Sequence, residues 1–466
     1  MSEAKTFDLI VLGGGPGGYA AAIRAAQLGG RVALVEQDAL GGTCTNRGCI
    51  PTKALAASAH LLERIHRSEE MGIRVPDGVE LDFSAVAKRR DDIVAELRTG
   101  IEGLLKANKV ELFRGRGKLT SPKQLRVGEQ ELKARSVILA TGSRPATLPM
   151  LPVDGKRVLS SDQLLASQSL PKRLVVVGGG VIGCEFASIY RAFGVEVWVV
   201  ELLDRLLPTM DAVLSKQLKR AFKQQGIHVL CSSAVQGLGE ASAEGLEVIL
   251  PEDERIACDQ VLVAVGRKAV TEDLGLEDCG LTLRRGCVET DAHMATPIEG
   301  LYAVGDLVGR TWLAHTAARE GEIAAANAMG QVEKMSYKAV PGVVFTNPEL
   351  ATVGLGPAEV KADKLDVTVG KFLYQASGKA LCDGVAEGRV EIICSASDQR
   401  VLGGWVAGQE AGILIAEIAL AVDLGLTAAQ LADVIHAHPT MPEMLAEAAA
   451  DSIGRAIHRA PARKKR

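Results

Sequence analysis

The sequence predicts an α/β protein with two Rossmann-like domains, followed by a C-terminal α+β domain. A glycine-rich turn follows a short apolar run near the N-terminus, and the same arrangement returns in the middle of the chain. From about Tyr337 onward the pattern changes to short β-like runs, and these precede helical patterns and a proline-bearing loop. Repeated strand–helix–strand modules followed by mixed strands and helices indicate this fold class. The expected C-terminal strands are 342–346, 366–372, 389–394 and 401–406.

The first glycine-rich turn has the spacing of a dinucleotide-binding site. It follows the apolar run 7–12, which is typical of a buried parallel strand, and a helical pattern follows it. Gly13 allows a tight turn, Gly15 lets the backbone approach a pyrophosphate, and Gly18 lets helix and strand pack closely. Glu36 ends the next strand about 20 residues later, where a carboxylate can bind both ribose hydroxyls. The alternative is a glycine-rich turn without a ligand.

The second turn repeats the same features. Gly178, Gly180 and Gly183 follow the apolar run 173–177, and Glu201 ends the next strand. A carboxylate at that strand end repels a 2′-phosphate, so we expect the second site to prefer NAD over NADP. The alternative is that Glu201 is only a solvent-exposed residue at a strand end. A repeated module favours a nucleotide-binding protein more strongly than either turn alone.

Composition narrows the class of protein. The 466 residues suggest about three domains. A net charge of -4 and an aromatic content of 3% argue against nucleic acid as a partner. No apolar run is long enough for a membrane span, and we expect the apolar stretch 412–426 to be a core helix. The nine cysteines do not resemble a secreted disulfide framework and no signal peptide is recognisable, so we expect a cytoplasmic protein.

Two cysteines form the most informative local feature of the chain. Cys44 and Cys49 lie in the glycine-rich segment 41–49, which we expect to be a tight loop leading into a helix. A helix N-terminus stabilises a thiolate and makes it reactive. Beside a nucleotide-binding turn, a reactive thiol pair can pass two electrons between a dinucleotide and a disulfide. Two structural cysteines or a metal site are the alternatives, although no histidine or second cysteine pair lies near in the sequence.

A histidine and a glutamate five residues apart lie near the C-terminus, in and just after the loop 436–442. Glu443 can hold the imidazole of His438 in one tautomer and support its protonated form. A dithiol reaction needs such a base to accept a thiol proton. Ordinary loop polarity is the alternative, and the two cysteines favour the catalytic interpretation.

Together these segments resemble the flavoprotein disulfide reductases that carry two dinucleotide-binding domains. The resemblance extends from Phe7 to about His458, and the segments 41–53 and 436–443 are its most specific parts. It implies four parts of the chain: the first part of an FAD-binding domain (1–148), an NAD-binding domain (149–269), the second part of the FAD-binding and central domain (270–337), and an interface domain that forms a homodimer (338–466).

The resemblance also implies FAD in the first module and NAD in the second. Asp306 is expected to bind the ribityl chain of FAD, and Lys53 to lie near the flavin ring, paired with Glu185. The FAD-binding residues that it implies are Gly13, Gly15, Gly18, Glu36, Gly42, Thr43, Lys53, Thr141, Gly142, Gly305 and Asp306. The NAD-binding residues that it implies are Gly178, Gly180, Gly183, Glu201 and Gly266.

The catalytic roles come from the same resemblance. Cys44 is expected to exchange with a thiol substrate and Cys49 to lie against the flavin ring, while His438 and Glu443 reach both cysteines from the other subunit of the dimer. The motifs are most similar to those of members that oxidise dihydrolipoamide with NAD⁺. The resemblance therefore implies a lipoyl domain of a 2-oxo acid dehydrogenase complex as the partner.

Two other functions stay open. An NADPH-dependent reductase of glutathione or a related disulfide conflicts with Glu201 and with the lack of a basic residue directly after it. A non-catalytic flavoprotein subunit conflicts with the presence of both cysteines and of the histidine–glutamate pair. One departure from the family pattern follows Arg267, where the segment 268–271 replaces the Pro-Asn-Thr that members often carry.

Overall fold

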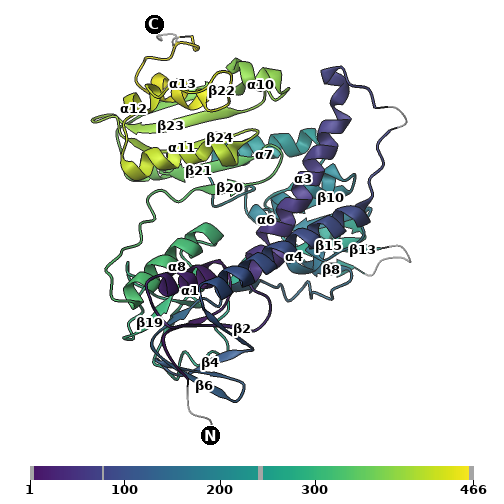
Figure 1. The fold of residues 1–466 in the computed structure, drawn as a ribbon. Helices are drawn as coiled ribbons and strands as arrows, with labels where there is room; N and C mark the ends of the chain where they lie inside the picture. The colour runs from purple at the N-terminus through teal and green to yellow at the C-terminus, as the bar shows by residue number, and fades with distance from the viewer. Residues whose placement is uncertain (1–4, 76–77, 240–244, 461–466) are drawn as a thin grey trace.

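The computed structural model describes residues 5–75, 78–239 and 245–460. Two mainly parallel sheets and one antiparallel sheet, each with helices packed against it, form the main part of the fold (Figure 1). The α/β class with a C-terminal α+β domain is therefore confirmed. The described N-terminal and C-terminal ends lie at opposite ends of the molecule (Figure 1).

The first sheet contains the first glycine-rich turn. Its strands β3, β2, β1 and β6 are parallel neighbours in that order, and β19 adds a further parallel strand beside β6. The antiparallel strands β5 and β4 extend it on the side of β6. The bounds are β1 Lys5–Leu12, β2 Val32–Glu36, β3 Glu111–Arg114, β4 Gly117–Ser121, β5 Gln124–Val127, β6 Gln130–Leu139 and β19 Leu301–Ala303.

The second sheet repeats the first in its order of strands. Its parallel strands lie in the order β11, β10, β9, β15, β8, so that β9 and β10 correspond to β1 and β2. In each module one helix follows the glycine-rich turn: α1 (Pro16–Gln27) in the first and α6 (Val181–Ala192) in the second. The strand bounds are β8 Val158–Ser160, β9 Arg173–Val177, β10 Glu196–Val200, β11 His228–Leu230 and β15 Gln260–Val263.

The second module is inserted into the first. The chain leaves the first module through β7 (Ser143–Pro145) and returns through β16 (Arg267–Ala269). These two segments pair as a short antiparallel ribbon, with Arg267 opposite Pro145. The ribbon therefore ties the outgoing and returning segments of the chain together.

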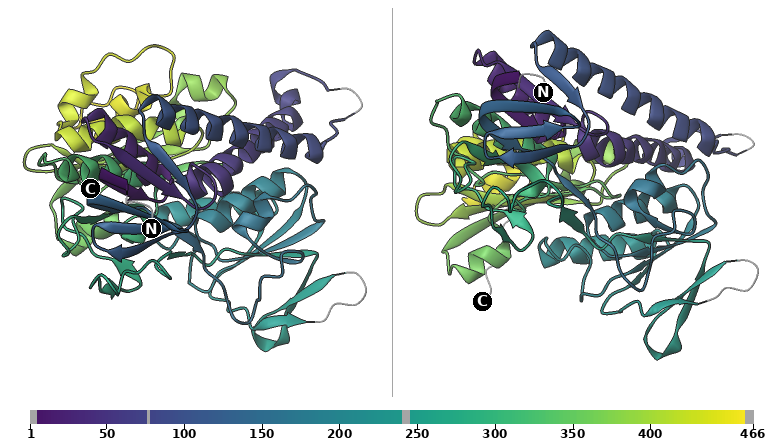
Figure 2. Two further views of the ribbon diagram at one scale, coloured as in Figure 1. Left: turned by 60° about the horizontal axis from the view of Figure 1, so that its bottom comes forward. Right: turned by 90° about the horizontal axis from the view of Figure 1, so that it is seen from below.

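Three helices connect the cysteine segment to both modules. The short helix α2 (Gly42–Arg47) carries Cys44, and the long helix α3 (Cys49–His66) starts at the second cysteine. The expectation of a loop around Cys44 was therefore wrong, because the positive φ of 90° at Gly41 lets a helical turn start there. Helix α3 packs against α4 (Phe83–Ala107) and against α6 of the second module (Figure 2).

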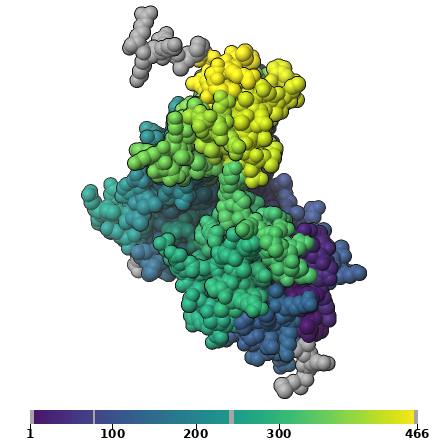
Figure 3. Space-filling view, turned by 90° about the vertical axis from the view of Figure 1, so that its left-hand side faces the viewer, coloured from purple at the N-terminus to yellow at the C-terminus, as the bar shows by residue number. Residues whose placement is uncertain are grey.

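The C-terminal part forms a separate lobe on the surface of the molecule (Figure 3). Its antiparallel sheet has the order β20, β21, β24, β23, β22, and β21 was missed from the sequence. Helix α11 was expected to lie in the core, but Ile413, Leu420 and Leu424 are 68%, 56% and 64% exposed. This helix is apolar except at Glu417 and Asp423, and one face of it packs on the sheet. The bounds are β20 Gly342–Val344, β21 Leu350–Gly354, β22 Val367–Leu373, β23 Arg389–Ser395, β24 Val401–Ala407, α11 Ala411–Leu424 and α13 Glu443–Ser452.

Shorter elements complete the fold, and no helix among the described residues has the length and apolar character needed to cross a bilayer. The remaining helices are α5 Ser161–Leu165, α7 Ala212–Gln224, α8 Ala314–Ala328, α9 Pro357–Ala362, α10 Gly378–Cys382 and α12 Ala428–Ala432. The remaining strands are β12 Gly237–Gly239, β13 Leu246–Ile249, β14 Arg255–Cys258, β17 Leu283–Arg284 and β18 Cys287–Val288.

Candidate active site

The first and third glycines of each turn lie where no side chain fits. A Cβ at Gly18 would lie 1.8 Å from the carbonyl oxygen of Gly13, and one at Gly183 would lie 1.9 Å from that of Gly178. Gly13 and Gly178 also have φ values of 105° and 110°, a left-handed region that favours glycine. Close packing of helix against strand in both modules therefore requires these glycines.

The middle glycines face open space. A Cβ at Gly180 would meet no atom within 4 Å, and one at Gly15 would meet only the Cα of Gly42, at 3.8 Å. Both glycines are N-caps, at the ends of α1 and α6 where unpaired N–H groups favour an anion. Each turn thus has a bare backbone and a helix N-terminus, as a bound pyrophosphate requires. The residues present fit a dinucleotide at both turns.

The two acidic strand ends bind their own turns in the same way. Glu36 accepts hydrogen bonds from the backbone N–H groups of Gly14 and Asp38, both at 2.7 Å. Glu201 accepts from Gly179 at 2.5 Å and from Leu203 at 2.7 Å. Both carboxylates are buried, so Glu201 is not a solvent-exposed residue. Burial raises the pKa of Glu36, against the lowering effect of its backbone hydrogen bonds.

Asp306 lies in a polar cluster that joins the two modules. Ser143 on β7 donates a hydrogen bond to Asp306, and Arg267 on β16 donates to the Ser143 hydroxyl at 2.7 Å. Burial raises the pKa of Asp306, while Ser143 and Arg267 lower it. The sequence did not identify Ser143 or Arg267 as site residues, because their role depends on the pairing of β7 with β16. Gly305 precedes Asp306 and donates its N–H to buried Glu320 at 2.6 Å.

The turns that close the modules also meet at this ribbon. The Thr141 hydroxyl donates to the carbonyl of Val270 at 2.8 Å, and Val270 N–H donates to Gly142 at 2.9 Å. A Cβ at Gly142 or at Gly266 would meet nothing within 4 Å, and both have positive φ values. The segment 268–271, which differs from the family pattern, therefore keeps backbone contacts with the first module that do not depend on its side chains.

The cysteine segment is held in place by an asparagine. The Asn46 side-chain amide donates to the carbonyls of Leu40 and Gly42, at 2.9 and 2.8 Å. The same segment touches the first turn, because a Cβ at Gly42 would lie 2.7 Å from the Cα of Gly15. Thr43 follows directly and faces Arg267, whose guanidinium lies 3.5 Å from the threonine hydroxyl. The α2 N-terminus is thus placed against the first dinucleotide turn, and Asn46 is a site residue that the sequence did not reveal.

The two thiols are free in the structure, and their surroundings shift their pKa values in opposite directions. A hydrogen bond from Cys44 and the positive charge of Lys53 lower the pKa of Cys49 to about 7, against the effect of burial. The same hydrogen bond, together with burial, raises the pKa of Cys44. Cys49 is therefore the thiolate of the reduced pair, and Cys44 is its hydrogen-bond donor.

Lys53 lies one turn after Cys49 on α3, so both side chains share a face of the helix. Its Nζ contacts both carboxylate oxygens of Glu185 on α6, at 2.8 and 3.0 Å. Glu185 is buried, and its charge raises the pKa of Cys49 while that of Lys53 lowers it. The charge beside the thiolate thus comes from a lysine whose own counter-ion belongs to the second module.

The structure pairs His438 with Glu443 and gives the neighbouring histidine another partner. The Nδ1 of His438 lies 2.8 Å from Glu443 Oε1, and Thr440 N–H donates to Oε2 at 2.8 Å. The Thr440 hydrogen bond and the His438 contact lower the pKa of Glu443. The His438 side chain is 80% exposed, whereas the His436 side chain is 9% exposed and contacts Glu417 at 2.9 Å.

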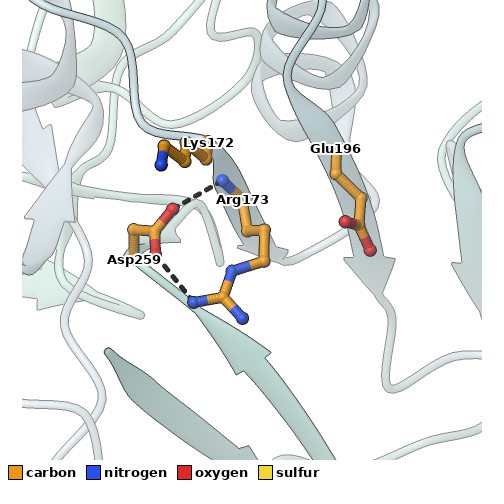
Figure 4. Close-up of a pocket in the computed structure, with 4 residues that line it drawn as sticks. All are labelled: Lys172, Arg173, Glu196 and Asp259. Atoms are coloured by element: carbon orange, nitrogen blue, oxygen red, sulfur yellow. Dashed lines mark hydrogen bonds and ion pairs between the residues drawn. The ribbon is translucent and has the colours of Figure 1, made fainter. Parts of the chain in front are cut away.

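A hollow in the second module carries no comparable chemistry. It is lined by Lys172, Arg173, Glu196 and Asp259 (Figure 4). Asp259 accepts from the Arg173 backbone and guanidinium, both at 2.8 Å, which ties the start of β9 to the loop before β15. The Arg173–Asp259 ion pair is therefore a structural contact. Within the described ranges, no three His, Cys, Asp or Glu side chains gather as a metal site would require.

Comparison with known proteins agrees with this site. Residues 7–321 match the family described as pyridine nucleotide-disulphide oxidoreductase, and residues 340–449 match the dimerisation domain of the same family. Dihydrolipoyl dehydrogenase of Chlamydia trachomatis is 41% identical over 100% of both chains. The protein of the same name from Thermus scotoductus is 42% identical over 97% of this chain and 99% of its own.

Solved structures agree as well. LpdA from Mycobacterium tuberculosis superposes with a TM-score of 0.90 at 30% identity, covering 96% of this chain and 99% of its own. RclA from Escherichia coli, an HOCl-induced flavoprotein disulfide reductase, superposes with a TM-score of 0.86 at 26% identity, covering 96% of this chain and 99% of its own. By the two glycine-rich turns, the cysteine pair and these matches, the chain belongs to the pyridine nucleotide-disulphide oxidoreductases.

Proposed function

We propose that the chain is a dihydrolipoyl dehydrogenase, which oxidises dihydrolipoyl groups to lipoyl groups and reduces NAD⁺. The observation that carries this proposal is the placement of the cysteine pair against the first dinucleotide turn, with Lys53 one turn after Cys49 on α3. Relatives of that name at 40% to 42% identity over almost the whole chain support the choice of substrate. Buried Glu201 supports NAD over NADP, because a 2′-phosphate would meet its carboxylate.

FAD is assigned to the first module and NAD to the second. The residues proposed for FAD are Gly13, Gly15, Gly18, Glu36, Gly42, Thr43, Lys53, Thr141, Gly142, Gly305 and Asp306, and those for NAD are Gly178, Gly180, Gly183, Glu201 and Gly266. When bound, FAD supplies the two-electron chemistry that links a dithiol to a nicotinamide. The domain division 1–148, 149–269, 270–337 and 338–466 is part of the proposal, and the separate sheets support it.

The protein side chains perform the thiol exchange. A dihydrolipoyl thiolate attacks the Cys44 sulfur of the Cys44–Cys49 disulfide, and Cys49 leaves as the thiolate that Lys53 stabilises. The second dihydrolipoyl thiolate then attacks the lipoyl sulfur of the mixed disulfide, which closes the lipoyl ring and releases Cys44. His438 accepts the thiol protons, and Glu443 holds its Nδ1 so that Nε2 takes part in the transfer. The dithiol loses two electrons and the cysteine pair gains them.

The proposed enzyme is a homodimer in which His438 acts on the cysteines of the other subunit. The match of residues 340–449 to a dimerisation domain supports a dimer. The exposed apolar face of α11 supports it too, because a partner would cover that face. Its proposed partner is a lipoyl domain of a 2-oxo acid dehydrogenase complex. Its thiol chemistry fits a reducing compartment, and we propose the cytoplasm.

A specificity comparison tests the reaction. Purified protein is assayed with lipoamide or glutathione disulfide as the acceptor and with NADH or NADPH as the donor. We expect turnover of lipoamide with NADH to exceed every other combination by at least about tenfold. A preference for glutathione disulfide with NADPH would replace the proposal with the glutathione-type reductase, and no turnover with any pair would favour a non-catalytic subunit.

Mixed dimers test the sharing of the site between subunits. Cys49→Ser homodimers are expected to be inactive, and His438→Gln homodimers to keep only about a hundredth of the activity. When the two are co-expressed, one site of the mixed dimer combines intact Cys49 of one chain with intact His438 of the other. We expect lipoamide turnover to rise above this residual level only in this mixed dimer. Turnover that stays at the residual level in an isolated mixed dimer would mean that His438 serves the cysteines of its own chain.

A further inference from the structure

A phenylalanine of the C-terminal part lies against the charged pair beside the cysteines. The Lys53 Nζ lies 4.4 Å from the centroid of the Phe345 ring, within the usual range of a cation–π contact. The backbone N–H of Phe345 donates to Glu185 Oε1 at 3.0 Å. One residue therefore contacts both members of the Lys53–Glu185 pair, through its side chain and its backbone.

The neighbours of Phe345 keep it in this position. Asn347 donates its N–H to the Ser188 hydroxyl on α6 at 3.0 Å, and its side-chain amide donates to Glu63 on α3 at 2.8 Å. Gln225, just after α7, donates to the Asn347 carbonyl at 2.7 Å. The segment 345–347 is thus bound by three helices that belong to the two dinucleotide-binding modules, which leaves the ring little freedom to move away from Lys53.

We propose that Phe345 is a positioning residue of the redox centre, which holds the Lys53 ammonium on the face of α3 that it shares with Cys49. Glu185 holds Lys53 toward α6, and the Phe345 ring adds a second contact, 4.4 Å from the ammonium. The Lys53 side chain is 33% exposed, so without the ring the ammonium can turn toward solvent. Phe345 then acts on Cys49 through Lys53, without touching either thiol.

The test measures the ionisation of Cys49 directly. In holoenzyme with Cys44→Ser, a Cys49 thiolate beside the oxidised flavin gives a long-wavelength absorbance, whose growth with pH reports its pKa. We expect Phe345→Leu to move the midpoint of this titration upward by about half a unit. Lys53→Gln removes the ammonium altogether, so the upward shift of the midpoint in that variant is the largest that loss of Phe345 could produce. Phe345→Tyr keeps the ring and should keep the original midpoint.

Two controls separate positioning from general disturbance. Phe372→Leu makes the same change at a buried site in β22, away from Lys53, and should leave the midpoint unchanged. In the Lys53→Gln background, Phe345→Leu should produce no further shift. A midpoint that is unchanged by Phe345→Leu, or a shift that persists without Lys53, would overturn the inference.

Further outcomes also decide the matter. If Phe345→Leu does not fold, Phe345→Met replaces it, because methionine is apolar and lacks a ring; an unchanged midpoint in that variant overturns the inference. Absence of the absorbance at every pH in the Cys44→Ser protein would overturn the placement of Cys49 and this inference with it. The inference rests on the proposed function only for the role of Cys49. The titration uses neither lipoamide nor NAD, so failure of the lipoamide assay alone would leave it standing.

Discussion

Replacing Glu201 by glutamine should weaken NAD binding and leave FAD in place. Glu201 accepts two backbone hydrogen bonds, at 2.5 and 2.7 Å, with one carboxylate oxygen each. The glutamine amide has one acceptor oxygen, so either Gly179 or Leu203 N–H would face an NH₂ group. The unpaired donor destabilises free and NAD-bound protein alike, so the change in affinity comes from the ribose hydroxyls that Glu201 is proposed to bind. Hydrogen bonds to a charged group contribute about 1.5–3 kcal/mol, and each 1.4 kcal/mol changes an affinity by about tenfold. We therefore expect the dissociation constant for NAD⁺ to rise by about 10- to 150-fold.

Titration calorimetry with NAD⁺ measures the effect on the purified flavoprotein. The duplicated fold supplies a matched control, because Glu36 accepts the same two kinds of hydrogen bond in the first module. Glu36→Gln should lower the fraction of protein that retains FAD and leave the NAD⁺ affinity of the loaded fraction unchanged. If Glu201→Gln reduced FAD content, or left the NAD⁺ dissociation constant unaltered, the assignment of the two modules would be wrong.

Three further outcomes are expected. His438→Gln should slow lipoamide turnover by about 10²-fold, the usual contribution of a general base, in steady-state assays, and a near-normal rate would remove that role. The pKa of Cys49 near 7 depends on the hydrogen bond from Cys44, so in two-electron-reduced protein that keeps both thiols its thiolate absorbance should be lost as pH falls below about 6 and be complete above about 8; a band that is constant over this range would contradict the charge arrangement. Gly370→Ala places a Cβ 1.8 Å from a carbonyl of α13, and should lower the free energy of unfolding by about 1–3 kcal/mol in thermal or denaturant unfolding. The control Gly378→Ala meets no atom within 4 Å and should be close to neutral.

Local sequence pattern was enough for the two modules. The alternation of apolar run, glycine-rich turn and helix is a short-range signal, and both turns have the close contacts that their glycines predict. Prediction from the sequence failed for elements whose position depends on contacts between residues far apart in the chain. Strand β21 was missed, since it is recognised by its pairing with β20 and β24, and α11 was expected to be a core helix although Ile413, Leu420 and Leu424 are exposed. Cys44 was expected in a loop, and the left-handed backbone of Gly41 instead starts a helix there.

The sequence by itself determined the family, the duplicated dinucleotide module and the identity of the reactive thiols, because each depends on residues that are neighbours in the chain. The Lys53–Glu185 pair was implied by the resemblance, and only the tertiary structure decided that Phe345 contacts this pair and how the surroundings shift the two thiol pKa values in opposite directions. Lys53, Glu185 and Phe345 are far apart in the sequence, and packing of α3 against α6 and the C-terminal part brings them together. The Lys53 ammonium lies 2.8 Å from the Glu185 carboxylate and 4.4 Å from the centroid of the Phe345 ring, and the Phe345 N–H lies 3.0 Å from Glu185. Coulomb and cation–π energies depend on distance in space, so no spacing along the chain can report them.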